Sequence, residues 1–227
     1  MRNDVITIAL AKGRLADKTM DLLEAIGVDC TQARDPGRRL VLEDKTGAYR
    51  FILVKPSDVP TYVEHGVADI GVAGKDTLLE QNRPLYEMID LGFGRCRLCI
   101  AGYPDGRGSA VTNANFRVAT KYPNIAREYF GARGETIEII ELHGSVELGP
   151  LVGLSDVILD IVESGSTLRA NGLEVLETVV ENVSARMVVN RVALKVKGAR
   201  IRALMEAMAA QLKKESEEGT QDDGVRA

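Results

Sequence analysis

The sequence has few cysteines, few aromatic residues and no tryptophan. Its 227 residues include three cysteines, two histidines and 4% aromatic residues. Three cysteines are too few for a disulfide framework in a chain of this length, so we expect free thiols and a reducing compartment. Cys96 and Cys99 form a CxxC pair without a second pair, and only His65 and His143 could complete a zinc site. Residues three apart on a strand point to opposite faces, so we interpret both thiols as structural and expect no protein-held metal.

Long apolar runs and an excess of positive charge are also missing. No stretch approaches the roughly 18 apolar residues that span a membrane, and the short apolar run near the N-terminus is typical of a strand rather than a signal segment. We therefore expect a cytoplasmic protein. The net charge of −4 argues against nucleic acid or an anionic membrane as the main partner, because both require a large positive field. Any phosphate binding must depend on local groups.

Apolar, strand-like runs alternate with amphipathic segments along most of the chain. The strand-like runs are 5–10, 50–54, 69–73, 97–102, 116–120, 137–142 and 156–162. This alternation predicts an α/β protein with largely parallel sheets. In such proteins, ligands bind beyond the carboxyl ends of the strands. With 45% hydrophobic residues, the chain can form two lobes of about 100 residues each.

Two segments repeat one order of features. Residues 63–80 and 146–174 each run from a helix through an acid-led apolar strand into a glycine-containing turn and a Thr-Leu pair. We interpret them as parts of two lobes of similar build, although chance similarity between two βα units gives the same pattern.

Two long strand-like stretches flank the middle of the sequence, where the chain would pass from one lobe to the other and return. We therefore assign residues 1–93 and 184–214 to a discontinuous lobe I, and residues 94–183 to lobe II. Lobe I ends in a strong helical pattern. The last residues, 215–227, are polar and contain glycine, which predicts a flexible tail.

The most informative stretch is DIVESGSTLRANGL, residues 160–173. A buried-strand pattern ends here in two acids, followed by closely spaced hydroxyls, backbone N–H groups and a glycine able to adopt positive φ, which together suit a phosphate. Asp160 and Glu163 would repel a phosphate unless they bind a ribose hydroxyl or Mg²⁺, so a sugar phosphate fits better than a bare anion. The alternative is an ordinary turn whose Ser and Thr cap the next helix.

The spacing Asp-x-x-x-Ser-Gly-x-Thr is similar to the loop of common phosphoribosyltransferases, but those usually carry two adjacent acids where this chain has Leu159 and Asp160. The longer stretch 147–168 closely resembles the signature of ATP phosphoribosyltransferase, the first enzyme of histidine biosynthesis. The matching residues are Glu147, Gly153, Ser155, Ile158, Asp160, Ser164, Gly165, Thr167 and Leu168. The motifs LAKGRL, DPGRRL, SDVPTYVEHGVADIGVAGKDTLLE, ATKYPNIAREYF and VVNRV extend the resemblance over nearly the whole chain.

The resemblance implies a pentosyltransferase (EC 2.4.2.17) that transfers the 5-phosphoribosyl group of phosphoribosyl pyrophosphate to N1 of the adenine of ATP, with Mg²⁺ carried by the substrate. It implies a two-lobed fold like that of the type II periplasmic binding proteins, with the active site in the interlobe cleft. It also implies the short form of the family. In that form a homodimeric core joins a histidyl-tRNA-synthetase-like regulatory subunit in a hetero-octamer.

The same motifs imply the site residues of lobe I. Lys12, Gly13, Arg14 and Arg38 would contact ATP or the pyrophosphate. Among these, Arg14 and Arg38 are the expected catalytic residues, because two polyanionic substrates must meet and charge grows on the departing pyrophosphate. Arg39, the next residue on a predicted strand, would point away.

The remaining site residues fall in both lobes. Asp76 either meets the adenine amino group or caps a helix, Glu147 joins the ATP and pyrophosphate site, and Lys121 is a second basic residue with an open role. The resemblance assigns phosphoribosyl pyrophosphate to Asp160, Glu163, Ser164, Gly165, Ser166, Thr167 and Leu168.

Two other functions fit parts of the pattern. A solute-binding or sensor module would use the same two lobes, although the expected lack of a signal segment and the loop at 160–168 both oppose it. A phosphoribosyltransferase for another base would share the loop, and a purine-by-purine assay of pyrophosphate release distinguishes the two enzymes.

Overall fold

The structure is a computed structural model that describes residues 5–105 and 116–223, and only the main chain of residues 219–223. The described chain divides into two compact units. Unit 1 comprises the described parts of Met1–Leu78, Asn82–Gly94 and Ser184–Ala227, and unit 2 those of Leu79–Gln81 and Arg95–Val183. Unlike the predicted lobes, these units place the short segment 79–81 in unit 2 and Gly94 in unit 1.

Unit 1 is built on a six-stranded sheet in the order β2-β3-β1-β4-β11-β5. Its strands are β1 (Ile6–Ala11), β2 (Val41–Glu43), β3 (Tyr49–Val54), β4 (Ile70–Gly74), β5 (Tyr86–Asp90) and β11 (Ala185–Val189). Strand β1 is parallel to β3 and β4, whereas β2 and β11 run antiparallel to their neighbours. All six residues of β1 are buried, as expected for an inner strand covered on both faces.

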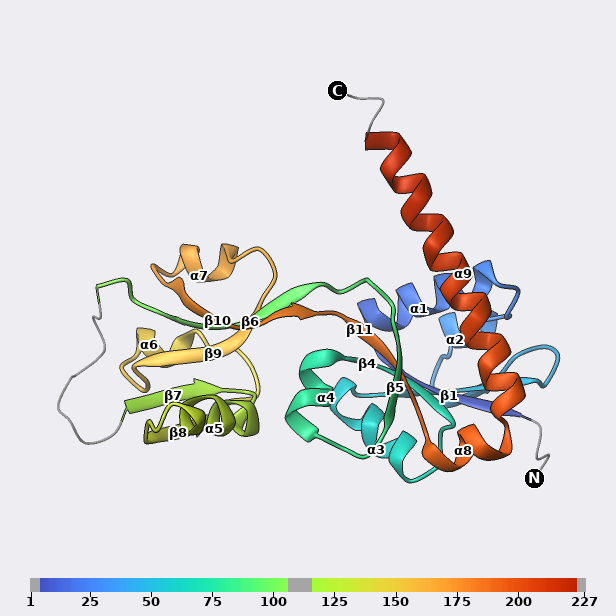
Figure 1. The fold of residues 1–227 in the computed structure, drawn as a ribbon, viewed down its shortest axis with the longest axis horizontal. Coiled ribbons are helices and arrows are strands. Elements are labelled where there is room, and N and C mark those ends of the chain that lie inside the picture. Colours follow the sequence, from blue (N-terminus) through green and yellow to red (C-terminus); the bar gives the residue numbers. More distant parts are fainter. Residues whose placement is uncertain (1–4, 106–115, 224–227) are drawn as a thin grey trace. The chain divides into compact units, whose positions relative to one another are not determined.

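Helices cover both faces of this sheet (Figure 1). They are α1 (Arg14–Ala25), α2 (Thr31–Arg34), the 3₁₀ turn η1 (Pro56–Asp58), α3 (Val59–Glu64), α4 (Lys75–Gln81), α8 (Arg191–Val196) and α9 (Gly198–Asp223). On one face, Met20 of α1 and Leu204 of α9 join the same buried cluster. On the other, α3 packs closely on β4. A Cβ at Gly71 would lie only 2.7 Å from Val59 and 2.6 Å from Val63, so this contact requires glycine.

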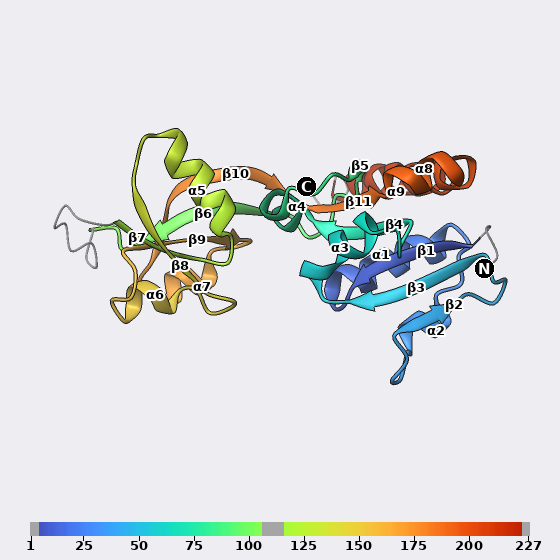
Figure 2. The same cartoon turned by 90° about the horizontal axis from the view of Figure 1, so that it is seen from below.

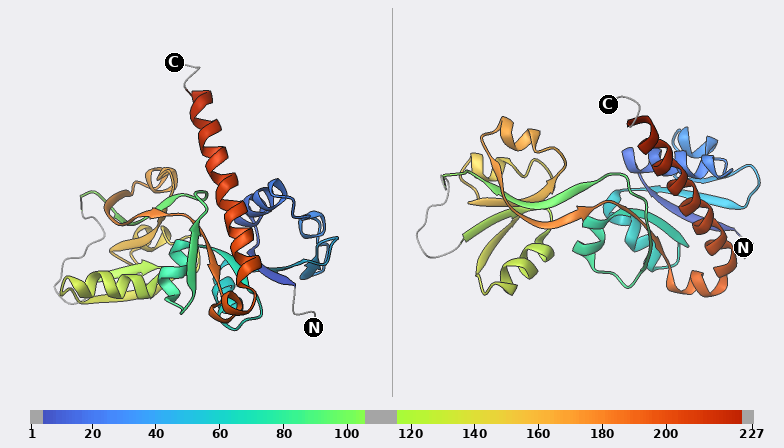
Figure 3. Two further views of the ribbon diagram at one scale, coloured as in Figure 1. Left: turned by 45° about the vertical axis from the view of Figure 1, so that its right-hand side comes forward. Right: turned by 45° about the horizontal axis from the view of Figure 1, so that its top comes forward.

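Helix α9 continues to Asp223 (Figure 3), so the predicted tail is wrong for residues 215–223, and 224–227 lie outside the described residues. Its first turns are held in the core by Ile201 and Leu204. Its later turns carry ion pairs between residues four apart, which stabilise a helix even where no apolar face is buried. The pairs are Lys213 with Glu217 at 3.9 Å and Lys214 with Glu218 at 3.8 Å.

Unit 2 has a five-stranded sheet in the order β10-β6-β9-β7-β8. Its strands are β6 (Cys96–Gly102), β7 (Phe116–Thr120), β8 (Ile137–Glu141), β9 (Val157–Val162) and β10 (Glu174–Val183), and its helices are α5 (Pro123–Ala132), α6 (Leu148–Leu151) and α7 (Ser166–Ala170). Helix α5 covers one face and α6 and α7 the other (Figure 2). Ile125 and Phe130 fill the first interface, and Val146 and Leu168 fill the second.

The two sheets share one strand order. The order β3-β1-β4-β11-β5 in unit 1 corresponds to β8-β7-β9-β6-β10 in unit 2. In both, three parallel strands are followed by one strand antiparallel to them and then by a fifth strand antiparallel to the fourth. The sequence echo therefore corresponds to equivalent parts of two similar units: α3, β4 and α4 in one, and α6, β9 and α7 in the other. Unit 1 adds β2 at its edge.

An aspartate heads the third parallel strand in each unit and fastens it to the middle one. Asp69 accepts the Thr7 N–H at 2.8 Å and pairs with Lys197 at 2.7 Å. Asp156 accepts the Arg117 N–H at 2.8 Å and pairs with the Arg117 guanidinium at 3.0 Å. Each aspartate N–H also bonds back to the carbonyl of the same neighbouring residue. We call these two arrangements the aspartate clamps.

The cysteines agree with the strand prediction. Cys96 packs on the α5 face of unit 2 and Cys99 on the α6 and α7 face, so the two thiols point apart. Burial raises the pKa of Cys30 to about 12, which keeps that thiol protonated. Among the described residues, no group of three or more His, Cys, Asp or Glu side chains is arranged to hold a metal ion. Within that same part of the chain, no helix has both the length and the apolarity needed to span a membrane.

Candidate active site

The parallel strands of unit 2 end at a common edge, and the predicted phosphate loop lies there. Thr120, the last residue of β7, donates its hydroxyl to the Leu159 carbonyl of β9 at 2.6 Å and accepts the Tyr122 N–H at 2.8 Å. Pairing with β8 places Thr120 opposite Glu141. Because the three strand ends are held in register, the residues that follow them start from a fixed edge.

The loop after β9 turns sharply at Gly165, which has a φ of 70° and precedes α7. This left-handed conformation favours glycine. Ser164 donates its hydroxyl to the Ser166 hydroxyl at 3.0 Å and accepts the Ser166 N–H at 3.3 Å. Ser164, Ser166 and Thr167 are all exposed. Glycine occupies the N-cap of α7 and has no side chain to cap the helix. The Ser166 N–H bonds the Ser164 hydroxyl, so an anion bound here would share or replace that bond.

The other loop residues differ in exposure: Asp160 and Glu163 present carboxylates, whereas the Leu168 side chain is buried. Asp160 lies in β9 on the same side as Ile158 and Val162, which is the side that α7 covers, and its carboxylate accepts the Ile161 N–H at 2.8 Å. Glu163 is exposed directly after the strand. Leu168 is different: its side chain is 4% exposed and belongs to the core. Only its main chain is available to a ligand, and its side chain anchors the turn.

Two further predicted residues lie at the same edge of unit 2. Glu147 is half-buried at the N-cap of α6. Lys121 is exposed after β7, beside the start of α5. The N-terminus of α5 is already occupied, because the Glu80 carboxylate accepts the N–H groups of Asn124 at 2.9 Å and Ile125 at 3.0 Å. Between the N-termini of α5 and α7, the one at Gly165 of α7 is therefore the better candidate for binding an anion.

Unit 1 gathers basic residues at the equivalent edge of its own sheet. Lys12 follows β1 and is tied to the end of β3, because its N–H bonds the Val54 carbonyl at 2.9 Å. Gly13 has a φ of 100° and forms the N-cap of α1, whose first residue is Arg14. All three residues of this turn are exposed. A turn with two cations and a glycine at a strand end is suited to binding phosphates.

Arg38 lies in the segment before β2, which places it near the same edge of the sheet. Strand β2 runs antiparallel to β3 and pairs Val41 with Ile52, so the residues before β2 lie beside the carboxyl end of β3. Arg38 is exposed and makes no hydrogen bond or ion pair to any described residue. Arg39 precedes β2 rather than lying on it, and its guanidinium bonds Gln32 at 3.1 Å. The two neighbouring arginines therefore differ, with Arg39 engaged inside its own loop.

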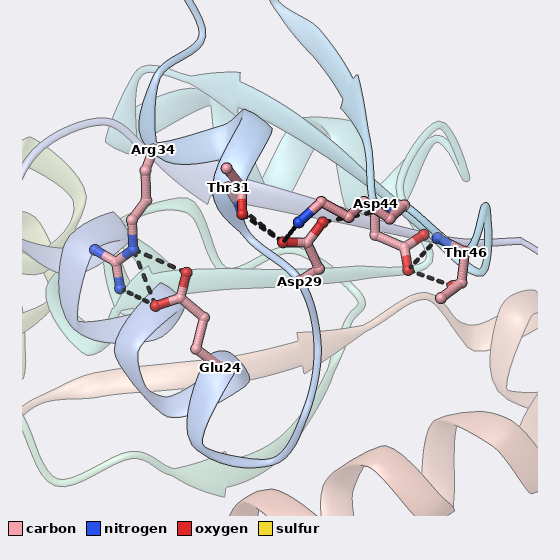
Figure 4. A network of polar contacts seen from close by, with 7 residues as sticks. Glu24, Asp29, Thr31, Arg34, Asp44 and Thr46 are labelled. Carbon is pink, nitrogen blue, oxygen red and sulfur yellow. Dashed lines mark hydrogen bonds and ion pairs between the residues drawn. The ribbon is translucent and has the colours of Figure 1, made fainter.

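A polar network fixes the chain on both sides of Arg38 (Figure 4). Arg34 bonds both oxygens of Glu24 through Nε at 3.0 Å, which ties α2 to α1. The Thr31 hydroxyl lowers the pKa of Asp29. Burial alone would raise the pKa of Asp44, but hydrogen bonds from Thr46 and from nearby backbone N–H groups lower it overall. These contacts anchor the ends of the segment that presents Arg38.

Asp76 lies in the first turn of α4 at the end of β4. Its carboxylate leans back over Gly74, since a Cβ added there would lie 2.1 Å from Oδ1. The N-cap of α4 is Gly74, which has no side chain to form a capping bond. The structure thus places Asp76 at the same edge as Lys12 and Arg14, and both roles predicted for its carboxylate stay predictions. Its neighbour Lys75 pairs with Glu87 at 2.6 Å.

One basic residue of the loop received no role from the sequence. Arg169 stands in α7, and its Nη1 donates to the Ser164 carbonyl at 3.0 Å. The available signal was its position four residues after Gly165, which places a side chain back over the preceding turn of a helix.

The arrangement defines a class of protein: an α/β protein of two similar units, each with exposed polar residues at the carboxyl edge of its parallel strands. The periplasmic aliphatic sulphonate binding protein SsuA from Escherichia coli has this fold, with a TM-score of 0.57 and 13% identity over 96% of this chain and 76% of that chain. The fold is therefore that of the type II periplasmic binding proteins. An identity this low indicates the fold alone.

Closer similarities identify the family. Residues 55–212 match the ATP phosphoribosyltransferase family. The ATP phosphoribosyltransferase of Ruminiclostridium cellulolyticum is 53% identical over 91% of this chain and 97% of that protein, and that of Lachnospira eligens is 55% identical over 88% and 93%. A chain of the ATP phosphoribosyl transferase (HisG:HisZ) complex from Thermotoga maritima aligns with a TM-score of 0.81 and 35% identity, over 92% of this chain and all of that one.

The chain belongs to the ATP phosphoribosyltransferase family. It is accordingly a pentosyltransferase, EC 2.4.2.17, of the enzyme class that begins histidine biosynthesis.

Proposed function

We propose that the protein transfers the 5-phosphoribosyl group of phosphoribosyl pyrophosphate to N1 of the adenine of ATP, releasing pyrophosphate and forming N1-(5-phosphoribosyl)-ATP. The observation that carries this proposal is the loop at 163–168, where a left-handed Gly165 and exposed hydroxyls follow a buried strand. Its N–H groups and hydroxyls would hold the 5-phosphate. Asp160 and Glu163, which precede them, would accept hydrogen bonds from the ribose hydroxyls.

The basic edge of unit 1 supplies the complementary charge. Displacement at the anomeric carbon places positive charge on the sugar and negative charge on the leaving pyrophosphate. Adenine N1 already carries a lone pair, so no covalent enzyme nucleophile is needed. In this proposal Arg14 and Arg38 stabilise the departing pyrophosphate, and Lys12 and the Gly13 turn bind phosphates of ATP or pyrophosphate. Asp76 and Glu147 complete the ATP and pyrophosphate site.

Mg²⁺ enters this scheme with the pyrophosphate. Magnesium is usually bound by substrate phosphates together with one or two carboxylates and water. Asp160 and Glu163 are oxygen donors of the suitable kind at the edge of unit 2, so the residues present are compatible with the ion. When bound, Mg²⁺ would neutralise charge on the leaving group.

We also propose a larger assembly. The Thermotoga maritima chain comes from a HisG:HisZ complex, and this chain matches its whole length. By analogy, this protein would be a short-form catalytic subunit that forms a homodimer and joins a histidyl-tRNA-synthetase-like regulatory subunit in a hetero-octamer. Its three free cysteines suit the reducing cytoplasm, where we place it. Co-purification from the native source, followed by mass determination of the complex, tests this assembly.

The reaction is tested with purified protein, phosphoribosyl pyrophosphate, Mg²⁺ and one purine nucleotide at a time. We expect pyrophosphate release with ATP and the changed ultraviolet spectrum of an N1-substituted adenine. Omission of Mg²⁺ should abolish the signal. Release with another purine but not with ATP, in the presence and absence of the co-purified subunit, would contradict the proposal.

A further inference from the structure

The Arg169 side chain bonds the main chain of the proposed phosphate loop. It stands in α7, and its side chain turns back so that Nη1 donates to the Ser164 carbonyl at 3.0 Å. The same atom lies 3.1 Å from the position that a Cβ at Gly165 would occupy. The Arg169 N–H also bonds the Gly165 carbonyl at 3.1 Å. The guanidinium therefore holds the turn at Ser164, and the Arg169 backbone N–H holds it at Gly165.

This contact matters for an anion because the Ser164 carbonyl is the group in the turn that would repel it. A loop that binds phosphate must direct its N–H groups outward and its carbonyl oxygens away. By engaging the Ser164 carbonyl, Arg169 keeps that oxygen from turning toward the ligand. It also supports Gly165 in the left-handed conformation that the turn requires.

Charge gives a second, independent reason. Between Asp160 and Leu173, Arg169 is the only cationic residue, whereas Asp160 and Glu163 are both acidic. With Arg169 the two acids and one base give this segment a net charge of −1, and without it the net charge beside the site that must accept a phosphate would be −2. An exposed guanidinium close to the turn partly offsets the two carboxylates.

We propose that Arg169 is a positioning residue for the sugar phosphate: its bond to the Ser164 carbonyl fixes the loop, and its charge offsets Asp160 and Glu163. This inference rests on the proposed function and deepens it. It assigns to Arg169 an effect on the 5-phosphate end of the sugar, and none on ATP.

The test compares three substitutions in the full-length protein. Arg169→Ala removes both the hydrogen bond and the charge, so KM for phosphoribosyl pyrophosphate should rise about tenfold, within the range for a bond to a charged group at an exposed site. Arg169→Gln keeps a donor without the charge and should fall between alanine and wild type. Arg169→Lys keeps the charge and one flexible donor, and should restore most of the affinity. KM for ATP should stay within twofold in all three.

Arg133→Ala is the matched control. Arg133 is also a partly exposed arginine of unit 2, but it pairs with Glu177 away from the loop. It should leave KM for phosphoribosyl pyrophosphate unchanged. An unchanged KM in Arg169→Ala, or equal rises in KM for both substrates, would overturn the proposal. Should Arg169→Ala fold poorly, the ordering of the glutamine and lysine variants decides in its place.

A binding measurement separates this inference from the proposed reaction. Ribose 5-phosphate is titrated into wild type and Arg169→Ala, and the loop amides are followed by NMR. Weaker binding by the variant supports the positioning role even if no purine is a substrate. If wild type catalyses the reaction and both proteins bind ribose 5-phosphate equally, the inference fails while the proposed function stands.

Discussion

In unit 1 the parallel strands are followed mainly by basic residues, with Asp76 as an acid among them, and in unit 2 mainly by hydroxyls and acids, with Lys121 as a base among them. Both edges belong to sheets with one strand order. Lys12 and Arg14 follow the middle strand of unit 1, whereas Ser164 and Thr167 follow the third strand of unit 2. The difference shows that the scaffold is set by buried strands and the chemistry by the few residues directly after them.

The aspartate clamps show how closely the scaffolds agree. Asp69 and Asp156 fasten equivalent strands through the same pair of backbone bonds. Their cations come from different places, however. Lys197 lies between helices α8 and α9, while Arg117 belongs to β7, the middle strand to which β9 is fastened. The same backbone arrangement thus allows the aspartate to pair with a cation from a different part of the chain in each unit.

The largest expected effect concerns the basic edge of unit 1. Arg14→Ala should lower kcat/KM roughly 10²- to 10³-fold, because it removes a charged donor that acts on the developing pyrophosphate charge. The melting temperature should change little, since Arg14 is exposed. Steady-state kinetics and a thermal melt measure both. Arg39→Ala is the control, and a loss of stability without a kinetic defect in Arg14→Ala would refute the assignment.

The clamps should differ in strength. Asp69→Ala should cost about 3 kcal/mol of local stability, because it leaves Lys197 and the buried Thr7 N–H unpaired. Asp156→Ala should cost about 2 kcal/mol, since the Arg117 side chain is more exposed, at 29% against 19% for Lys197.

Native-state hydrogen exchange measures the stability of each unit separately. Asp69→Ala should speed amide exchange in β1 and β4, and Asp156→Ala should speed it in β7 and β9. The exposed Glu43→Ala serves as control and should cost under about 0.5 kcal/mol. Equal loosening of both units by either variant would show that the clamps are not local.

The hydroxyl edge of unit 2 gives the next effect. Thr167→Ala should weaken the binding of phosphoribosyl pyrophosphate by roughly 1–3 kcal/mol, because a donor to the 5-phosphate is lost. Titration calorimetry without ATP measures it. Thr31→Ala, which removes a hydroxyl from unit 1, should leave this affinity unchanged. Wild-type affinity in the Thr167 variant would remove that residue from the site.

The smallest effect compares the two glycines that precede α4 and α7. Gly165→Ala should cost about 1–2 kcal/mol, since its φ of 70° disfavours a side chain. Gly165→Asn should cost less, because asparagine visits this conformation more readily. Gly74 has a φ of −67°, and Gly74→Ala need only displace the flexible Asp76 carboxylate. Denaturant unfolding ranks the three variants, and a larger cost at Gly74 would contradict this reading.

Much of the fold could be predicted because it depends on local pattern. The apolar run of β9 and the glycine at 165 predict a buried strand and a left-handed turn from the sequence alone. The continuation of α9 to Asp223 could not be predicted from composition, because a polar segment is typical of disorder, while pairs such as Lys213 with Glu217 stabilise the helix. The placement of 79–81 in unit 2 depends on Glu80 meeting α5, a contact between residues 44 or more positions apart.

The site was predicted unevenly for the same reason. Residues that directly follow strands, such as Arg14 and Thr167, could be found from sequence position and family resemblance. The core position of the Leu168 side chain and the backward turn of Arg169 depend on how α7 packs, which no spacing rule describes. The different engagement of Arg38 and Arg39 likewise depends on the partner that α2 presents.

The most direct measurement is a crystal structure of the protein with phosphoribosyl pyrophosphate and Mg²⁺. The account predicts that the 5-phosphate oxygens lie within about 2.7–3.2 Å of the hydroxyls and N–H groups of residues 164–167. Density for the sugar phosphate elsewhere, with these residues making no contact to it, would contradict the central claim that this loop holds the substrate.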